Sequence, residues 1–218
     1  LKKVMADVIG EAQSAFLGGR NILDGALIAN EIVDGWKKAK RKGLIFKIDL
    51  EKVYDSLNWE FLFSMLSSFG FGAKWFSCIK SSLSSARISI LVNGSPTKEF
   101  SPEKGLRQGD PLSPFLFNLA AEGLNMLLMR ARELGLLKGV VFGDNNVVAS
   151  HLQFADNSLL FCDAVWAEVL NLKKILRCFE IVSGLKINNH KSVICGFGIS
   201  ESVLHEFAGM LNCKVKSA

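Results

Sequence analysis

The sequence contains little tyrosine and histidine, and its cysteines are few and scattered. One tyrosine, three histidines and five cysteines occur in 218 residues. No pair of cysteines has zinc-ligand spacing, and their odd number argues against a disulfide framework. The histidines are far apart, so we expect them to be structural. We therefore expect neither a Cys/His metal centre nor a disulfide-linked partner, and we interpret the cysteines as reduced, buried thiols.

Long apolar runs, leader sequences, internal repeats and low-complexity linkers are also absent from the sequence. No run approaches the roughly 20 apolar residues of a membrane-spanning helix, and no basic-then-apolar leader precedes a cleavage site. We expect no membrane partner and a protein of the nucleus or the cytoplasm, intracellular and not secreted. The first residue is leucine, so we expect the start of the full protein to be missing.

Apolar residues and positive charge are both in excess. Hydrophobic residues make up 49% of the chain, and the formal net charge is +5. The apolar excess suggests surface that another segment covers, and the charge permits a polyanionic partner. The densest basic run is Lys37-Lys38-Ala39-Lys40-Arg41-Lys42. A solvated loop is its default interpretation, nucleic-acid contact comes second, and a nuclear-import signal comes third.

Hydrophobic periodicity predicts hairpins mixed with long helices. The expected strands are 44–49, a hairpin of 87–92 and 97–100 around Asn93-Gly94, a hairpin within 151–161, 186–188 and 192–195. The expected helices are 21–36, 59–69, 73–85, 113–134, 165–184 and 201–211. Ser113 is expected to cap its helix, with Pro114 at the first helical position. This mixture predicts an α+β fold with an antiparallel sheet on one side and helices on the other.

Two acidic residues stand in very apolar surroundings. Asp49 is expected at the exit of the strand 44–49, and Asp156 at the tip of the hairpin HLQFADNSLLF. A carboxylate in such a place is costly to bury without a compensating charge. A single acid at a strand end is usually a cap or a turn former, but two together suggest a Mg²⁺ site for phosphoryl transfer.

Two further features lie between these acids in the sequence. Tyr54, the only tyrosine, follows Asp49 by five residues, and the loop GLRQGDPLSP at 105–114 contains two glycines. Glycine lets a backbone approach a ligand closely. The bland interpretations are a half-buried tyrosine with a bonded hydroxyl and a plain turn before a helix.

Four ordered segments resemble the motifs of a known family. They are KIDLEKVYDSLNWEFL, GLRQGDPLSPFLFNL, HLQFADNSLLF and SGLKINNHKS. They resemble the motifs of reverse transcriptases, most of all those of plant LINE-type (non-LTR) retrotransposons, and QSAFLGGRNILDG resembles the fingers motif ahead of them. The resemblance implies an RNA-directed DNA polymerase that uses an RNA template, a DNA primer, dNTPs and two Mg²⁺ ions.

The resemblance also implies a domain organisation. It implies a right-hand polymerase palm with an antiparallel sheet backed by helices, plus part of the fingers. Residues 1–42 would be partial fingers and residues 43–218 the palm, with finger-like helices near 56–85 and without a thumb.

Several residues match functional positions of the family motifs. Asp49 matches the first metal-binding aspartate, and Asp156 matches the first aspartate of the hairpin motif. Tyr54 matches the aromatic residue that excludes ribonucleotides by crowding the sugar 2′ position.

Other matches concern the nucleotide and the template. Gln108 and Gly109 match the pair that lies against the incoming nucleotide and the new base pair. Lys191 matches the late lysine near the triphosphate, which would protonate the pyrophosphate leaving group. Arg20 lies where the fingers motif approaches the template or the nucleotide.

One position departs from the family pattern. The hairpin motif ordinarily reads F/Y-A-D-D, and here Asn157 replaces the second aspartate. The missing charge predicts that one Mg²⁺, instead of two, binds at Asp49 and Asp156. Two alternatives stay open, of which the first is an inactive palm that at most binds nucleic acid or serves as a scaffold. The second is an unrelated Mg²⁺ phosphohydrolase.

Overall fold

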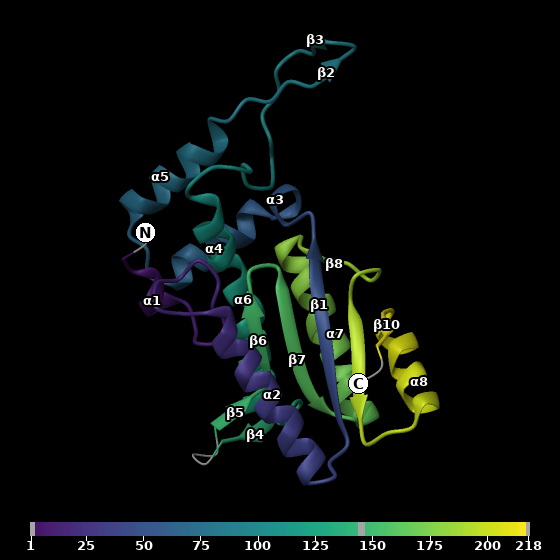
Figure 1. The fold of residues 1–218 in the computed structure, drawn as a ribbon. Helices are drawn as coiled ribbons and strands as arrows, with labels where there is room; N and C mark the ends of the chain where they lie inside the picture. Colours follow the sequence, from purple (N-terminus) through teal and green to yellow (C-terminus); the bar gives the residue numbers. More distant parts are fainter. Residues whose placement is uncertain (1–2, 144–146, 217–218) are drawn as a thin grey trace.

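The computed structural model describes residues 3–143 and 147–216 (Figure 1). Its helices are α1 (Met5–Val8), α2 (Ile22–Lys38), α3 (Val53–Ser56), α4 (Trp59–Ser68), α5 (Ala73–Ser84), α6 (Ser113–Glu133), α7 (Trp166–Ser183) and α8 (Glu201–Leu211). Its strands are β1 (Gly43–Glu51), β2 (Leu91–Val92), β3 (Ser95–Pro96), β4 (Val140–Phe142), β5 (Val147–Ala149), β6 (His151–Phe154), β7 (Asn157–Asp163), β8 (Lys186–Ile187), β9 (Val193–Phe197) and β10 (Lys214–Val215).

The main sheet is built around β1. Its strand order is β10-β9-β1-β7-β6, and β8 pairs with the last two residues of β1. All neighbours are antiparallel except β10, which runs parallel to β9. Leu44, Phe46 and Ile48 are buried on one face of β1, while the intervening Lys47 is exposed. Because successive side chains alternate between faces, β1 presents a core face and a second, more polar face.

Helices cover the two faces of the sheet differently. On the core face, Phe46 and Leu160 belong to the same cluster as Phe117 of α6 and Phe179 of α7. On the second face, a smaller cluster joins Trp36 of α2 to neighbours from the other elements, including Phe161. Figure 1 shows α2 crossing the lower end of this face and ending where β1 begins. The polar residues at the upper end of β1 therefore lie beyond the part of this face that the lower end of α2 crosses.

The α+β class and the sheet backed by helices are confirmed. Two local expectations are wrong. The strand does not end at Asp49, because Leu50 and Glu51 continue it by pairing with β8. Ser113 is not the cap of α6, because it already lies in the helix and its hydroxyl donates a hydrogen bond to the Arg107 carbonyl over 2.6 Å.

Further differences concern the strands. The hairpin β4–β5 and the strand β10 were not expected. The expected hairpin at 87–100 keeps its Asn93-Gly94 turn, with φ angles of +47° and +82°, but its strands shorten to β2 and β3. Its apolar side chains are exposed, so no core extends its pairing. No helix among residues 3–143 and 147–216 is long and apolar enough to cross a membrane.

Candidate active site

The two central strands bring the acidic positions together. The β1–β7 register pairs Asp49 directly with Asn157, and the backbone N–H of Leu50 donates a hydrogen bond to the Asp156 carbonyl over 3.0 Å. In a β-ladder, paired residues point their side chains to the same face. Asp49 and Asn157 therefore point to the same face of the sheet, and Asp156 precedes Asn157 in the turn. The convergence of the Asp49 and Asp156 carboxylates stays a prediction. The Asn157 amide also donates a hydrogen bond to the Asp156 carboxylate over 3.1 Å.

A glutamine from the N-terminal segment holds the hairpin tip. Ala155 has a φ of +52°, the left-handed conformation that lets β6 turn tightly into β7. The Gln13 carboxamide oxygen accepts hydrogen bonds from the N–H of Ala155 over 3.1 Å and from that of Ala15 over 3.0 Å. Gln13 is 1% exposed and its backbone forms a bridge with Gln153 of β6. The tip that presents Asp156 is thus fixed by a segment more than a hundred residues away in the sequence.

The turn after β8 places Lys191 near Asp49. The N–H of Asn188 donates to the Asp49 carbonyl over 2.8 Å, and the N–H of Asp49 donates to the Ser192 hydroxyl over 3.3 Å. The Lys191 ammonium lies 3.9 Å from the Asp49 carboxylate. The lysine side chain is 69% exposed, so this ion pair adds little stability. The arrangement leaves the ammonium free to contact another anion.

Tyr54 lies close to the hairpin tip. Burial raises the pKa of its phenol, and the negative charge of Asp156 raises it further. Its ring packs against Phe117 of α6 with a centroid distance of 6.3 Å. Tyr54 is therefore a neutral, positioned aromatic beside one of the acids. It also lines a groove of about 1630 Å³ that α3, α5 and the loop before α6 enclose.

The loop before α6 is locked against α3 and α4 through Gly105. The Gly105 N–H donates to the Leu57 carbonyl over 2.7 Å, and the Trp59 indole donates to the Gly105 carbonyl over 2.6 Å. The predicted nucleotide-contacting residues, Gln108 and Gly109, follow in this loop and are exposed. They are not among the residues that line the groove, although both of their neighbours are. The structure thus brings Arg107 and Asp110 of this loop to the groove that Tyr54 lines, but not Gln108 and Gly109 between them.

Arg20 is engaged by the backbone. Its guanidinium donates hydrogen bonds to three carbonyls, those of Ile9 (3.0 Å), Gly10 (2.6 Å) and Gln13 (2.7 Å). It therefore supports the segment that holds the hairpin tip. Its contact with template or nucleotide stays a prediction, and these bonds leave it few donors for that role.

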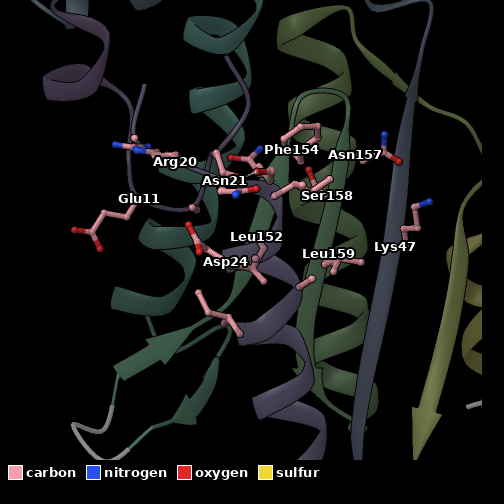
Figure 2. A pocket seen from close by; sticks show the side chains of 18 residues that line it. Glu11, Arg20, Asn21, Asp24, Lys47, Leu152, Phe154, Asn157, Ser158 and Leu159 are labelled. Carbon is pink, nitrogen blue, oxygen red and sulfur yellow. Dashed lines mark hydrogen bonds between the residues drawn. The ribbon is translucent and has the colours of Figure 1, made fainter. Parts of the chain in front are cut away.

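A cavity of about 480 Å³ lies between Arg20 and the second face of the sheet. Figure 2 shows side chains from the loop before α2 on one side, and Phe154, Asn157 and Leu159 of the hairpin on the other. Lys47 of β1 also lines it. Asp49 and Asp156 line neither this cavity nor the groove. Tyr54 lines the groove and Asn157 lines the cavity, so these two residues do not share one hollow.

Two residues of this site, Gln13 and Lys47, were missed in the sequence. Lys47 lies two positions before Asp49 and shares its face of β1. A charged residue at an alternate position of an apolar strand was the available signal. For Gln13 no local pattern was available, because its partner Ala155 is distant in the sequence.

The expected binding of one Mg²⁺ ion at the hairpin tip stays a prediction. No group of three or more His, Cys, Asp or Glu side chains within the described ranges is arranged to hold a metal. Two adjacent carboxylates, however, are a sufficient protein contribution for Mg²⁺, which keeps several waters and takes further oxygens from phosphates. Asp49 and Asp156 stay the predicted source of these carboxylates, while Asn157 supplies no charge for a second ion.

The family assignment follows from comparisons with known proteins. Residues 1–207 match the family described as reverse transcriptase (RNA-dependent DNA polymerase). The chain belongs to the reverse transcriptase family. The family's activity is RNA-directed DNA polymerisation, a nucleotidyl transfer, and its members generally use a divalent metal ion.

Several relatives come from non-LTR retrotransposons. The chain is 31% identical over 198 residues to a 149 kDa protein of transposon TX1 of Xenopus laevis, covering 88% of the chain and 14% of that protein. It is 30% identical over 184 residues to the Pol polyprotein of the element R2DM of Drosophila melanogaster, covering 84% of the chain and 17% of that polyprotein. An uncharacterized mitochondrial protein of Arabidopsis thaliana is 47% identical over 69 residues, covering 32% of the chain and 57% of that protein. The chain thus spans less than a fifth of the first two relatives.

Solved telomerase structures share the fold. The apo telomerase of Candida tropicalis has a TM-score of 0.65 and 14% identity, covering 92% of this chain and 40% of that one. The telomerase of Candida albicans, in complex with a fragment of telomeric RNA, has a TM-score of 0.63 and 12% identity, covering 88% of this chain and 31% of that one. At these identities the likeness establishes the polymerase fold alone.

Proposed function

We propose that this reverse transcriptase chain is the polymerising part of a non-LTR retrotransposon protein, which copies an RNA template onto a DNA primer with dNTPs. The observation that supports this most is the pairing of Asp49 with Asn157 on adjacent strands, with Asp156 in the turn directly before Asn157. Under this proposal residues 43–218 act as the palm, and residues 1–42 belong to the fingers. The 47% identity over 69 residues to a protein of Arabidopsis thaliana supports a plant origin, and the resemblance of the four motifs supports the LINE type. We place its action in the nucleus or the cytoplasm, where such a template and primer occur.

In the proposed reaction, the primer 3′-hydroxyl attacks the α-phosphate of a dNTP and pyrophosphate leaves. Asp49 and Asp156 would hold Mg²⁺, which supplies neutralisation of the charge that develops on the phosphate oxygens. The Lys191 ammonium, 3.9 Å from Asp49, would donate a proton to the leaving pyrophosphate. Tyr54, beside Asp156, would crowd the sugar 2′ position and so select deoxynucleotides. Gln108 and Gly109, which are exposed in the loop before α6, would contact the incoming nucleotide and the new base pair.

Asn157 supports a second candidate function, an inactive palm that only binds nucleic acid or acts as a scaffold. Two unit charges about 4 Å apart interact by roughly 4 kcal/mol at an effective dielectric constant near 20, and a divalent ion doubles this. If desolvation leaves only about a third of that sum, the missing charge lowers metal affinity or rate about a hundredfold. Weak activity and no activity are thus the two outcomes to separate.

The test is primer extension by this chain joined to the flanking polymerase segments of one of its longer relatives. With an RNA template, a DNA primer, dNTPs and Mg²⁺, we expect slow extension that Asp49→Asn abolishes. The matched control is Glu133→Gln, because Glu133 is 59% exposed in a surface ion pair with Arg130. Extension that survives Asp49→Asn would contradict the proposal. Absence of extension, with nucleic-acid binding retained, would assign the second candidate function.

A further inference from the structure

Six basic side chains gather at the end of β1 that lies away from the acids. We name this surface the basic corner, and it consists of Lys37, Lys38, Lys40, Arg41, Lys42 and Lys138. The Asp163 carboxylate links the run 37–42 to Lys138, because it lies 3.1 Å from the Arg41 guanidinium and 3.9 Å from the Lys138 ammonium. The other four lysines of the corner have no carboxylate within ion-pair distance among the described residues. The corner therefore presents largely uncompensated positive charge.

Local structure accounts for only part of this charge. Lys37 and Lys38 lie in the last turn of α2, where cations favour the negative end of the helix dipole. Lys40, Lys42 and Lys138 lie outside that turn. Crowded like charges repel one another and oppose folding. A surface that concentrates them is thus best explained by an anionic partner.

The backbone of the basic run is folded. This conformation decides between the two partners that such a run suggests, a nucleic acid and a nuclear-import receptor. The N–H of Arg41 donates to the Trp36 carbonyl over 3.0 Å, and Lys40 turns the chain with a φ of +50°. Trp36 is 2% exposed, and Gly43 packs so closely on its ring that a Cβ there would lie 2.6 Å from it. A receptor that binds a linear signal needs an extended segment, which this anchored turn does not offer. A fixed array of ammonium and guanidinium groups instead suits the phosphates of a polynucleotide.

The basic corner is far from the candidate active site. Seven residue steps along β1 separate Lys42 from Asp49, or about 23 Å at the rise of a β-strand. Figure 1 shows the end of α2 and the start of β1 at the bottom of the molecule, opposite the upper end of β1 that leads to α3. Nucleic acid on the corner would thus lie outside the hollows around Tyr54 and Asn157.

We propose that the basic corner is a second nucleic-acid binding surface, which contacts the phosphate backbone of single-stranded RNA without reading its sequence. It would hold a part of the polynucleotide that is not being copied. The proposal depends on charge and position and does not require that the chain polymerises.

The experiment compares two double substitutions that remove equal charge from helix surfaces. Lys37→Gln with Lys38→Gln changes the corner, and Lys173→Gln with Lys174→Gln changes the exposed surface of α7. Binding of a labelled single-stranded RNA of about 30 nucleotides is measured by fluorescence anisotropy at several salt concentrations. Each lost phosphate contact lowers the slope of log affinity against log salt by about 0.7, so two contacts lower it by about 1.4 and weaken binding roughly twentyfold near 0.1 M salt.

We expect this loss for the corner variant and less than a twofold change for the α7 variant. A second corner variant, Lys40→Gln with Lys42→Gln, should repeat the loss, and equal melting temperatures would exclude unfolding as its cause. Equal effects of the corner and α7 substitutions would overturn the proposal, because they would show a general charge effect. Unchanged RNA affinity, with capture of the folded chain by a purified nuclear-import receptor, would also overturn it and assign the run to peptide recognition.

Discussion

Single side chains decide how firmly the hairpin tip is held. Gln13 is the clearest case, because one carboxamide oxygen accepts from two backbone N–H groups and so ties residues 13–15 to the turn at Ala155. Asp156 follows that turn directly. The candidate metal position therefore depends on a residue without catalytic chemistry of its own.

Replacement of Gln13 should destabilise the chain. Gln13→Leu keeps a similar volume but leaves the N–H groups of Ala15 and Ala155 without their acceptor, and each buried unsatisfied group costs about 1–3 kcal/mol. We expect the free energy of unfolding, measured in urea, to fall by about 3 kcal/mol. The control is Gln108→Leu at an exposed position, which should change it by less than about 0.5 kcal/mol. Similar small effects of both substitutions would contradict the clamp.

His151 should make stability depend on pH. Burial, reinforced by the positive charge of Arg132, lowers the pKa of His151 to about 4, whereas the unfolded chain titrates near pH 6.5. Below pH 6.5 the unfolded state binds a proton that the folded state refuses until about pH 4, so stability falls as the pH drops through this interval. The loss is about 2 kcal/mol between pH 7 and pH 5, and from about pH 7.5 upward the group contributes almost no slope.

The measurement is urea unfolding at about pH 7 and about pH 5 for the chain and for His151→Gln, whose amide does not titrate. We expect the loss of stability on acidification to be about 2 kcal/mol smaller in the variant. An identical loss in both proteins would show that His151 does not account for the dependence.

Sequence alone identified the residues whose chemistry is local. Asp49, Asp156 and Asn157 stood out as polar groups in apolar surroundings, and the structure pairs Asp49 with Asn157 and leaves Asp156 in the adjoining turn. Gln13 could not be recognised in this way, because the groups that it binds become its neighbours only after folding.

The loop before α6 depends on the conformation of one glycine. Gly105 has a φ of +83°, and a Cβ there would lie 2.5 Å from the Tyr54 carbonyl oxygen and 3.0 Å from that of Asp55. Gly109, in the same loop, also has a φ of +83°, but a Cβ there would meet nothing within 4 Å. A substitution at Gly109 therefore tests the backbone conformation alone, whereas a substitution at Gly105 tests the backbone conformation together with close packing.

Alanine substitution at these glycines should have unequal effects. Gly109→Ala adds only the left-handed backbone penalty of about 1–2 kcal/mol. Gly105→Ala adds the same penalty and also pushes α3 away from the loop, so we expect it to cost at least about 2 kcal/mol more. Urea unfolding of both variants measures the difference. Equal costs would show that the loop does not press against Tyr54 in solution.

The elements with a complete local pattern were predicted, and those that depend on distant partners were not. Asn21 caps α2 and Asn58 caps α4 through bonds to nearby N–H groups, so the local sequence determines where these helices begin. β10 has two residues and exists only because it pairs in parallel with β9. The sequence likewise predicted a strand that stops before Glu51, because Glu51 belongs to β1 only through its pairing with Lys186 of the distant β8.

The whole molecule separates three surfaces along one sheet. The acidic tip and Lys191 lie toward the upper end of β1, the groove and the cavity flank that tip, and the basic corner lies at the lower end. The order of motifs in the sequence identified the family, which residues 1–207 confirm. The assignment of residues 1–42 to the fingers stays a prediction, although α2 packs on the sheet.

The central claim is that Asn157 weakens an otherwise well-built polymerase site, and it is tested most directly by restoring the missing charge. The measurement is primer extension on an RNA template by two proteins that share the same flanking polymerase segments, one with Asn157 and one with Asn157→Asp. Asn157 already pairs with Asp49, so an aspartate there would add a carboxylate beside Asp49 without rearranging β7. We predict slow but measurable extension with Asn157 and extension about a hundredfold faster with Asn157→Asp. Equal, robust extension by both proteins would contradict the account.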